Sequence, residues 1–232
     1  MKIIKKINSL FNSEIFKDSA SYTILNFLEK ALPFLVFPIL TRTLSIEDVG
    51  MFVLYQTLIE ILMPILTLSI DNTILLNYYK LELTDFKKYF SNGIFVFFIV
   101  FVLVFIFILS FRFPLAQQIN FSPFWLPFVV IMIFFRFFTQ NRQNIWRIQY
   151  NIKNYSKFTL SISLLNNLLG IGLVLFTDIG WAGMIIGHFV GYVIFGTYAM
   201  YTFFYEGFIV FHKATSDYVK DILKISCPIA LH

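Results

Sequence analysis

Polar residues recur at helical spacing in a segment that is otherwise apolar. Successive members are separated by four, three, four and four positions, at Gln56, Glu60, Met63, Thr67 and Asp71. This spacing places them within a narrow sector of one helical face. A carboxylate that faced lipid would be costly, so the face is expected to contact other helices or a water-filled cavity. Glu60 and Asp71 are therefore candidates for contact with a substrate or an ion, and the alternative is a packed, protonated or partnered pair that fixes helix geometry.

Three further charges interrupt apolar segments. Glu29 and Lys30 are adjacent, so they point about 100° apart on a helix and at least one of them needs a partner from elsewhere. Arg136 is a candidate partner for Glu29, Glu60 or Asp71. Neutralisation of Arg136 by one of these acids is one reading. The other is a cationic site for a phosphate, because guanidinium geometry suits a bidentate contact.

Two amides and a histidine mark later apolar segments. Asn166 and Asn167 could hydrogen-bond between helices or contact a sugar. His188 could act as a protonatable switch or as an interhelical hydrogen-bonding residue. Glycines recur every fourth position around this histidine, at Gly183, Gly187 and Gly191. Such a pattern lets helix backbones approach closely, so packing is the expected role of this stripe.

The sequence offers no catalytic constellation. It contains no nucleophile elbow, no Gly-rich phosphate loop and no metal-ligand pair at helical spacing. A single cysteine, Cys227, rules out an internal disulfide framework, and no Cys/His spacing indicates zinc. We therefore expect a protein that is not an enzyme and that uses neither a cofactor nor a metal.

The composition indicates a chain that lies in lipid. Hydrophobic residues make up 58% of the sequence and charged residues 13%, and 31 residues are phenylalanine. This exceeds what a soluble domain can bury, because a globular surface must remain largely polar. The purest apolar run, Ile94 to Leu109, is expected to face lipid on the outside of the molecule, with phenylalanines that leucine could replace. The expected fold is all-α, a polytopic membrane protein.

Hydropathy and start signals predict six transmembrane helices and the start of a seventh near Asp221. The predicted spans are Ser19 to Thr43, Asp48 to Asn77, Lys88 to Phe111, Pro123 to Gln143, Phe158 to Phe176 and Trp181 to Tyr205. The short Asp178-Ile179-Gly180 turn makes the fifth and sixth helices antiparallel neighbours. The corresponding division is a cytoplasmic segment over residues 1–18, a six-helix unit over 19–205, and a connection with the start of helix seven over 206–232.

The distribution of Lys and Arg predicts the orientation. Fourteen of the 18 basic residues fall on the side of the N-terminus, in the N-terminal segment and in the second, fourth and sixth connections, whereas Arg42 and Arg112 fall on the other side. The N-terminus is therefore expected in the cytoplasm, and the net charge of +5 reflects membrane orientation and not nucleic-acid binding.

Several motifs give the chain a family resemblance. They are Ser19-Ala-Ser-Tyr22, Pro38-Ile-Leu-Thr-Arg-Thr-Leu44, Glu47-Asp-Val-Gly50, Leu68-Ser-Ile-Asp71 and Tyr78-Tyr79. In this order they resemble the start of the polysaccharide exporters, the O-antigen and capsule repeat-unit flippases of the multidrug/oligosaccharidyl-lipid/polysaccharide transporter superfamily. The segment from Lys224 to His232 looks like the opening of a second lobe.

The resemblance implies one six-helix lobe, the N-terminal half of a two-lobed transporter of the bacterial cytoplasmic membrane. Such proteins move a polyprenyl-diphosphate-linked oligosaccharide between leaflets by alternating access, so the implied partners are this lipid, membrane lipid, H⁺ or Na⁺ and a second lobe. The implied substrate-binding residues are Lys30, Arg136, Asn166 and Asn167. The implied ion-coupling residues are Glu29, Glu60 and Asp71. The alternatives are a drug or lipid II exporter of the same superfamily, a lobe without activity, and a short chain that pairs with a second copy.

Overall fold

The computed structural model describes residues 14–210 and 215–230. For a few residues within the helices it describes the backbone but not the side chain. The described chain folds into eight α-helices, and the described residues form no strand. They are α2 (Glu14–Thr43), α3 (Ile46–Thr67), α4 (Ile70–Tyr78), α5 (Leu83–Ile119), α6 (Trp125–Ile148), α7 (Ile152–Phe176), α8 (Ala182–Tyr205) and α9 (Ser216–Ala230). The predicted all-α class is confirmed.

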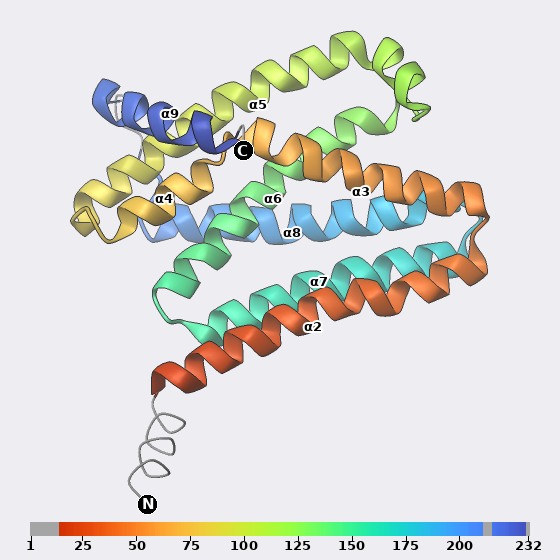
Figure 1. Ribbon diagram of the computed structural model, residues 1–232, viewed down its shortest axis with the longest axis horizontal. Helices are drawn as coiled ribbons and strands as arrows, with labels where there is room; N and C mark the ends of the chain where they lie inside the picture. Colours follow the sequence, from red (N-terminus) through yellow and green to blue (C-terminus); the bar gives the residue numbers. More distant parts are fainter. Residues whose placement is uncertain (1–13, 211–214, 231–232) are drawn as a thin grey trace, which may run out of the picture.

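The connections alternate between two ends of the molecule. Figure 1 shows the turns α2–α3, α5–α6 and α7–α8 at one end, and the connections α4–α5 and α6–α7, with the end of α8 and the start of α9, at the other. We call the second the α9 end. The start of α2 lies at this same end (Figure 1), and the orientation of the two ends in the membrane stays a prediction.

Four described helices are long and apolar enough to cross a membrane: α3, α5, α7 and α8. The helix α6 is not among them, because Arg136, Arg142 and a run of amides lower its hydropathy. The helix α2 is described only in part, and its Phe34–Thr43 stretch is apolar but short. Together these helices make the chain a multi-pass membrane protein, whereas the count of six spans stays a prediction.

The predicted span from Asp48 to Asn77 is wrong as a single helix. The chain leaves the α-helical conformation at Leu68 and Ser69, whose φ angles of 47° and 52° are left-handed. The Thr67 hydroxyl accepts a hydrogen bond from the Ser69 N–H at 3.2 Å, a local bond of the kind by which Thr and Ser compete with the helical ladder. The break separates the polar stripe, so Asp71 lies in the first turn of a second helix, α4, and not on α3.

Other boundaries differ by up to six residues, apart from those of α5. The third predicted span, Lys88 to Phe111, lies within the much longer α5, and the last helix begins at Ser216, before the predicted start near Asp221. Arg142 lies at the end of the predicted span and is counted among the basic residues of the fourth connection, but its side chain is buried inside α6 with 3% of its surface exposed. Hydrophobicity marks where a helix crosses lipid, but helices extend beyond that layer where tertiary contacts support them.

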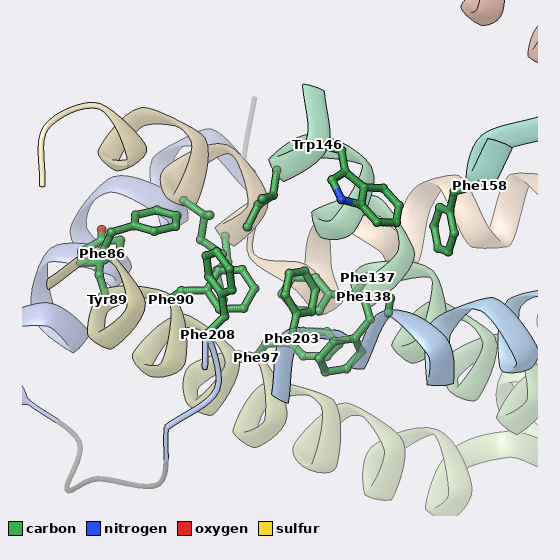
Figure 2. Packing of buried hydrophobic residues seen from close by; sticks show 14 of the residues in the cluster. Phe86, Tyr89, Phe90, Phe97, Phe137, Phe138, Trp146, Phe158, Phe203 and Phe208 are labelled. Carbon is green, nitrogen blue, oxygen red and sulfur yellow. The ribbon is translucent and has the colours of Figure 1, made fainter. Parts of the chain in front are cut away.

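Aromatic side chains fill the core at the α9 end. Figure 2 shows rings from α5, α6 and α8 packed together, including Phe90, Phe97, Phe137 and Phe203. The rings of Phe97 and Phe137 stack at a centroid distance of 3.8 Å. The expectation that the Ile94 to Leu109 run faces only lipid is therefore wrong for Phe97, which is fully buried, whereas its neighbour Phe98 is 52% exposed. A uniformly apolar run carries no periodic signal for the side that packs.

The helices α7 and α8 make the closest backbone approach. A Cβ atom built on Gly187 would lie 2.5 Å from the Gly170 backbone nitrogen, and one on Gly183 would lie 3.0 Å from the Val174 nitrogen. The predicted packing role of the glycine stripe is confirmed. Because the stripe holds α8 tightly against α7, these two helices form a continuous wall for the site described next.

Candidate functional site

A central cavity of about 610 Å³ lies between α2, α3, α6, α7 and α8. Its apolar lining comes mainly from Phe34 to Leu40 of α2 and from the α3 face that carries Phe52 and Ile59. Its polar lining consists of Gln56, Glu60, Arg136, Ser163, Asn166, Asn167, His188 and Tyr192. The cavity has a volume typical of small-molecule sites, which combine apolar walls with a few converging polar groups.

A second cavity, of about 360 Å³, lies toward the α9 end and is called the end cavity here. Its lining is almost wholly polar and comes from α4, α6, α7 and α8. It consists of Asp71, Asn72, Leu75, Arg136, Thr139, Gln140, Gln143, Asn144, Arg147, Tyr155, Ile162 and Tyr192. Asp71 belongs to this cavity and not to the central one, because the helix break at Leu68 and Ser69 redirects α4.

Arg136 lies where the two cavities meet. It lines both of them, together with Ile162 and Tyr192. Its Nη1 atom donates to Glu60 Oε1 at 3.0 Å, and the arginine side chain is 27% exposed while that of Glu60 is 69% exposed. Of the acids that the sequence left open as partners and whose side chains the structure describes, Glu60 pairs with Arg136, whereas Asp71 accepts a hydrogen bond from Gln140. Glu60 and Arg136 both line the central cavity, so an anion that enters this cavity can reach Arg136 in place of the carboxylate.

A polar stripe along α6 forms the wall of the end cavity. Arg136, Gln140, Gln143 and Arg147 follow each other at spacings of four, three and four, so they lie on one helical face. The sequence analysis did not identify Gln140, Gln143, Asn144 or Arg147 as site residues. The same periodicity that revealed the α3 stripe could have found them, but the predicted span stopped at Gln143.

Hydrogen bonds hold this stripe in place. The Gln140 amide donates to Asp71 Oδ2 at 3.1 Å, and the Gln143 amide donates to Thr159 Oγ1 at 2.8 Å. Arg147 donates to the Tyr155 hydroxyl at 3.2 Å. The first bond joins α6 to α4, and the other two join it to two successive turns of α7. The cavity wall is therefore ordered before any ligand binds.

The predicted amide pair lies on the α7 wall of the central cavity. Asn166 and Asn167 are both buried, at 5% and 7% exposure, and the Asn167 amide donates to the Ser163 backbone oxygen at 2.7 Å. Asn166 Oδ1 has no hydrogen-bond partner among the described residues and faces Gly191 of α8. His188 lines the same cavity, with its ring 5.9 Å from that of Phe52 and 6.1 Å from that of Tyr55.

The structure therefore brings five of the seven predicted site residues to the two cavities: Glu60, Asp71, Arg136, Asn166 and Asn167. The remaining two, Glu29 and Lys30, belong to α2, but their side chains lie outside the part of the chain that the structure describes. Within the described residues, no group of three or more His, Cys, Asp or Glu side chains is arranged to hold a metal ion.

Arg142 stands apart from both cavities. Its guanidinium makes two hydrogen bonds with the Glu206 carboxylate and lies 4.2 Å from the centroid of the Trp146 ring. Glu206 caps α8, and its backbone oxygen also accepts a hydrogen bond of 2.6 Å from Lys87 of α5. This network joins α5, α6 and α8, so Arg142 has a structural role and is not a ligand-binding cation.

The arrangement suits a ligand with an anionic centre and a polar portion. A guanidinium at the junction can hold a phosphate oxygen pair, and the amide-rich end cavity can exchange hydrogen bonds with hydroxyl groups. The larger central cavity adds apolar surface beside the same arginine.

Comparisons with known proteins point to one family. A family model described as "Polysaccharide biosynthesis protein" matches residues 15–232, nearly the whole chain. The searches of curated proteins and of solved structures gave no significant match.

Proposed function

The chain belongs to the polysaccharide biosynthesis protein family, and from this premise we propose that it is a transporter lobe, the N-terminal half of a repeat-unit flippase. In this proposal the complete transporter moves polyprenyl-diphosphate-linked oligosaccharides across the bacterial cytoplasmic membrane by alternating access. The product supplies O-antigen, capsular or exopolysaccharide synthesis. The chain acts as a carrier and not as an enzyme, with its N-terminus in the cytoplasm.

One observation carries the proposal: Arg136 lies at the junction of a mixed and a polar cavity inside a helical membrane bundle. An ionisable side chain in such a bundle is costly and marks a functional site by default. The Glu60 carboxylate that now contacts Arg136 lines the central cavity, so a diphosphate bound in this cavity can take its place. The two phosphate groups of the diphosphate offer the paired oxygens that a guanidinium binds best.

The other residues take the roles that the family resemblance implies for them. Arg136 and Lys30 hold the diphosphate, and Asn166 and Asn167 contact the substrate from the α7 wall. Glu60, once displaced from Arg136, binds H⁺ or Na⁺, and Glu29 and Asp71 are the further candidates for this coupling. A second lobe faces this one and completes the passage, since one lobe alone cannot enclose a two-sided path.

Replacement of Arg136 tests the proposal. The test uses a strain whose own exporter is deleted and that produces the full-length protein. With Arg136→Ala this strain is expected to lose its surface polysaccharide, because the diphosphate loses its cationic contact. Arg112→Ala is the matched control, since Arg112 lies over the Phe113 ring and lines neither cavity. Surface polysaccharide is measured by immunoblot, and the amount of protein in the membrane fraction is measured in parallel.

Normal export by Arg136→Ala at normal membrane levels would remove Arg136 from the substrate site. If the unaltered protein exports a cationic drug or lipid II but not the repeat unit, the proposed substrate class is wrong.

A further inference from the structure

The end cavity has no role in the function proposed so far, apart from Arg136 and Asp71 on its wall. It adjoins the proposed diphosphate position, because Arg136 lines both cavities. A group bonded directly to a diphosphate at Arg136 therefore lies at the mouth of the end cavity. In a glycosylated polyprenyl diphosphate this group is either the first sugar or the first isoprene unit.

The lining of the end cavity distinguishes these two groups. Gln140, Gln143 and Asn144 each carry a carboxamide with one acceptor oxygen and two donor hydrogens. An isoprene unit would cover these groups without hydrogen bonds, which costs free energy for every polar atom left unpaired. A hydroxyl both donates and accepts, so a ring with several hydroxyl groups can satisfy a wall of mixed donors and acceptors.

A second anion fits this cavity less well than a sugar. Asp71 contributes a carboxylate to the wall, and its Oδ2 atom already orients the Gln140 amide at 3.1 Å. Carboxylate oxygens accept hydrogen bonds from hydroxyls and repel phosphate oxygens. The two arginines of the cavity lie at positions 136 and 147, three helical turns apart along α6, with the amides between them. The middle of the cavity is thus polar but carries no cation of its own.

The helix break next to Asp71 supports a built site. Two successive non-glycine residues, Leu68 and Ser69, adopt left-handed conformations that are unfavourable for side chains with a Cβ atom. The break redirects α4 so that Asp71 faces Gln140 of α6. The Gln143 amide is fixed independently by Thr159 of α7. Two of the three carboxamides are therefore oriented in advance by neighbouring helices.

We propose that the end cavity is a subsite for the first sugar of the substrate, the one bonded directly to the diphosphate, with Gln140, Gln143 and Asn144 as its specificity-determining residues. This inference rests on the proposed function, because it takes the diphosphate at Arg136 as its starting point. The remaining sugars and the start of the lipid chain occupy the central cavity, which is larger and has apolar walls.

Binding of two short-chain probes to the protein in lipid nanodiscs tests the subsite. The probes are citronellyl diphosphate and a panel of citronellyl-diphospho-hexoses, and their dissociation constants are measured by isothermal titration calorimetry. At least one sugar-bearing probe is expected to bind more tightly than citronellyl diphosphate. Gln140→Ala and Gln143→Ala are each expected to raise the dissociation constant of that probe by roughly tenfold, because one hydrogen bond to the sugar is lost. The dissociation constant of citronellyl diphosphate should not change.

Gln149→Ala is the matched control, an exposed glutamine at the end of α6 that lines neither cavity. Gln140→Met, which keeps the side-chain length, repeats the test if the alanine variant does not give a single species in size-exclusion chromatography. Arg136→Ala is expected to weaken both kinds of probe.

Three results would overturn the subsite, and they separate it from the proposed function. If Arg136→Ala weakens both probes but no hexose improves on citronellyl diphosphate, the diphosphate site stands and the subsite fails. The subsite also fails if Gln140→Ala and Gln140→Met each weaken the binding of the sugar-bearing probe and of citronellyl diphosphate to the same extent. If the unaltered protein binds neither probe, the diphosphate site itself fails and the subsite fails with it.

Discussion

The glycine stripe between α7 and α8 gives the sharpest test of the packing described above. An alanine Cβ at Gly191 would lie 1.6 Å from Asn166 Oδ1, the end of a side chain, whereas one at Gly187 would lie 2.5 Å from a backbone nitrogen of Gly170. At Gly172 nothing lies within 4 Å of the added atom. The three substitutions are chemically identical and differ only in what the new methyl group meets.

The expected changes in the free energy of unfolding follow from these neighbours. Overpacking typically costs about 1–3 kcal/mol, and alanine regains up to about 1 kcal/mol of helix propensity over glycine. Asn166 can rotate toward the central cavity that it lines, so Gly191→Ala should cost about 1 kcal/mol. At Gly187 the two backbones must separate, so its alanine variant should cost about 3 kcal/mol or more, and Gly172→Ala should cost nothing.

A double-mutant cycle with Asn166→Ala completes the test, with unfolding followed by circular dichroism in mixed dodecylmaltoside and SDS. Asn166→Ala should remove the cost of Gly191→Ala, with a coupling energy of about 1 kcal/mol, and should leave the cost of Gly187→Ala unchanged. The reasoning is refuted if Gly187→Ala is as stable as Gly172→Ala, or if Asn166→Ala relieves both glycine substitutions equally.

Three further predictions concern the core, the buried ion pair and the orientation. Arg142→Met should lower the free energy of unfolding by about 3 kcal/mol, which is the lower end of the range for a broken buried ion pair, because its carboxylate partner is partly exposed. An unchanged unfolding midpoint would contradict the structural role of Arg142. Phe97→Leu should cost about 1 kcal/mol through its lost ring stacking, while Phe98→Leu should have no measurable effect in the same assay, and equal effects would place both rings in lipid. In a variant without the native cysteine, Asp178→Cys should react with an impermeant maleimide added to intact cells and Lys153→Cys should not, whereas the reverse pattern would invert the orientation.

Much of the architecture could be read from the sequence because it depends on residues close together in the chain. The approximate positions of most helices follow from hydropathy, and the Asp178–Gly180 turn fixes α7 and α8 as neighbours. The spacing of the α8 glycines predicted a close approach of helix backbones, and α8 approaches α7 closely at these glycines. The polar stripe on α3 was visible for the same reason, since Gln56 and Glu60 lie one turn apart and both reach the central cavity. A helical period is a property of a single segment, so one sequence is enough to detect it.

Only the tertiary structure decided which of these polar residues meet. The sequence left Arg136 with three possible acidic partners, and of the two whose side chains are described it pairs with Glu60, because of how α3 and α6 cross. The break at Leu68 and Ser69 sends Asp71 to Gln140, although the spacing alone put it on the face of Glu60. Arg142 has the same residue type as Arg136 and lies six positions further along α6, yet it faces Glu206 in the core and not the cavities. Such pairings are set by the relative position of distant helices, which arises from the packing of all their side chains and has no signature in the spacing within any one of them.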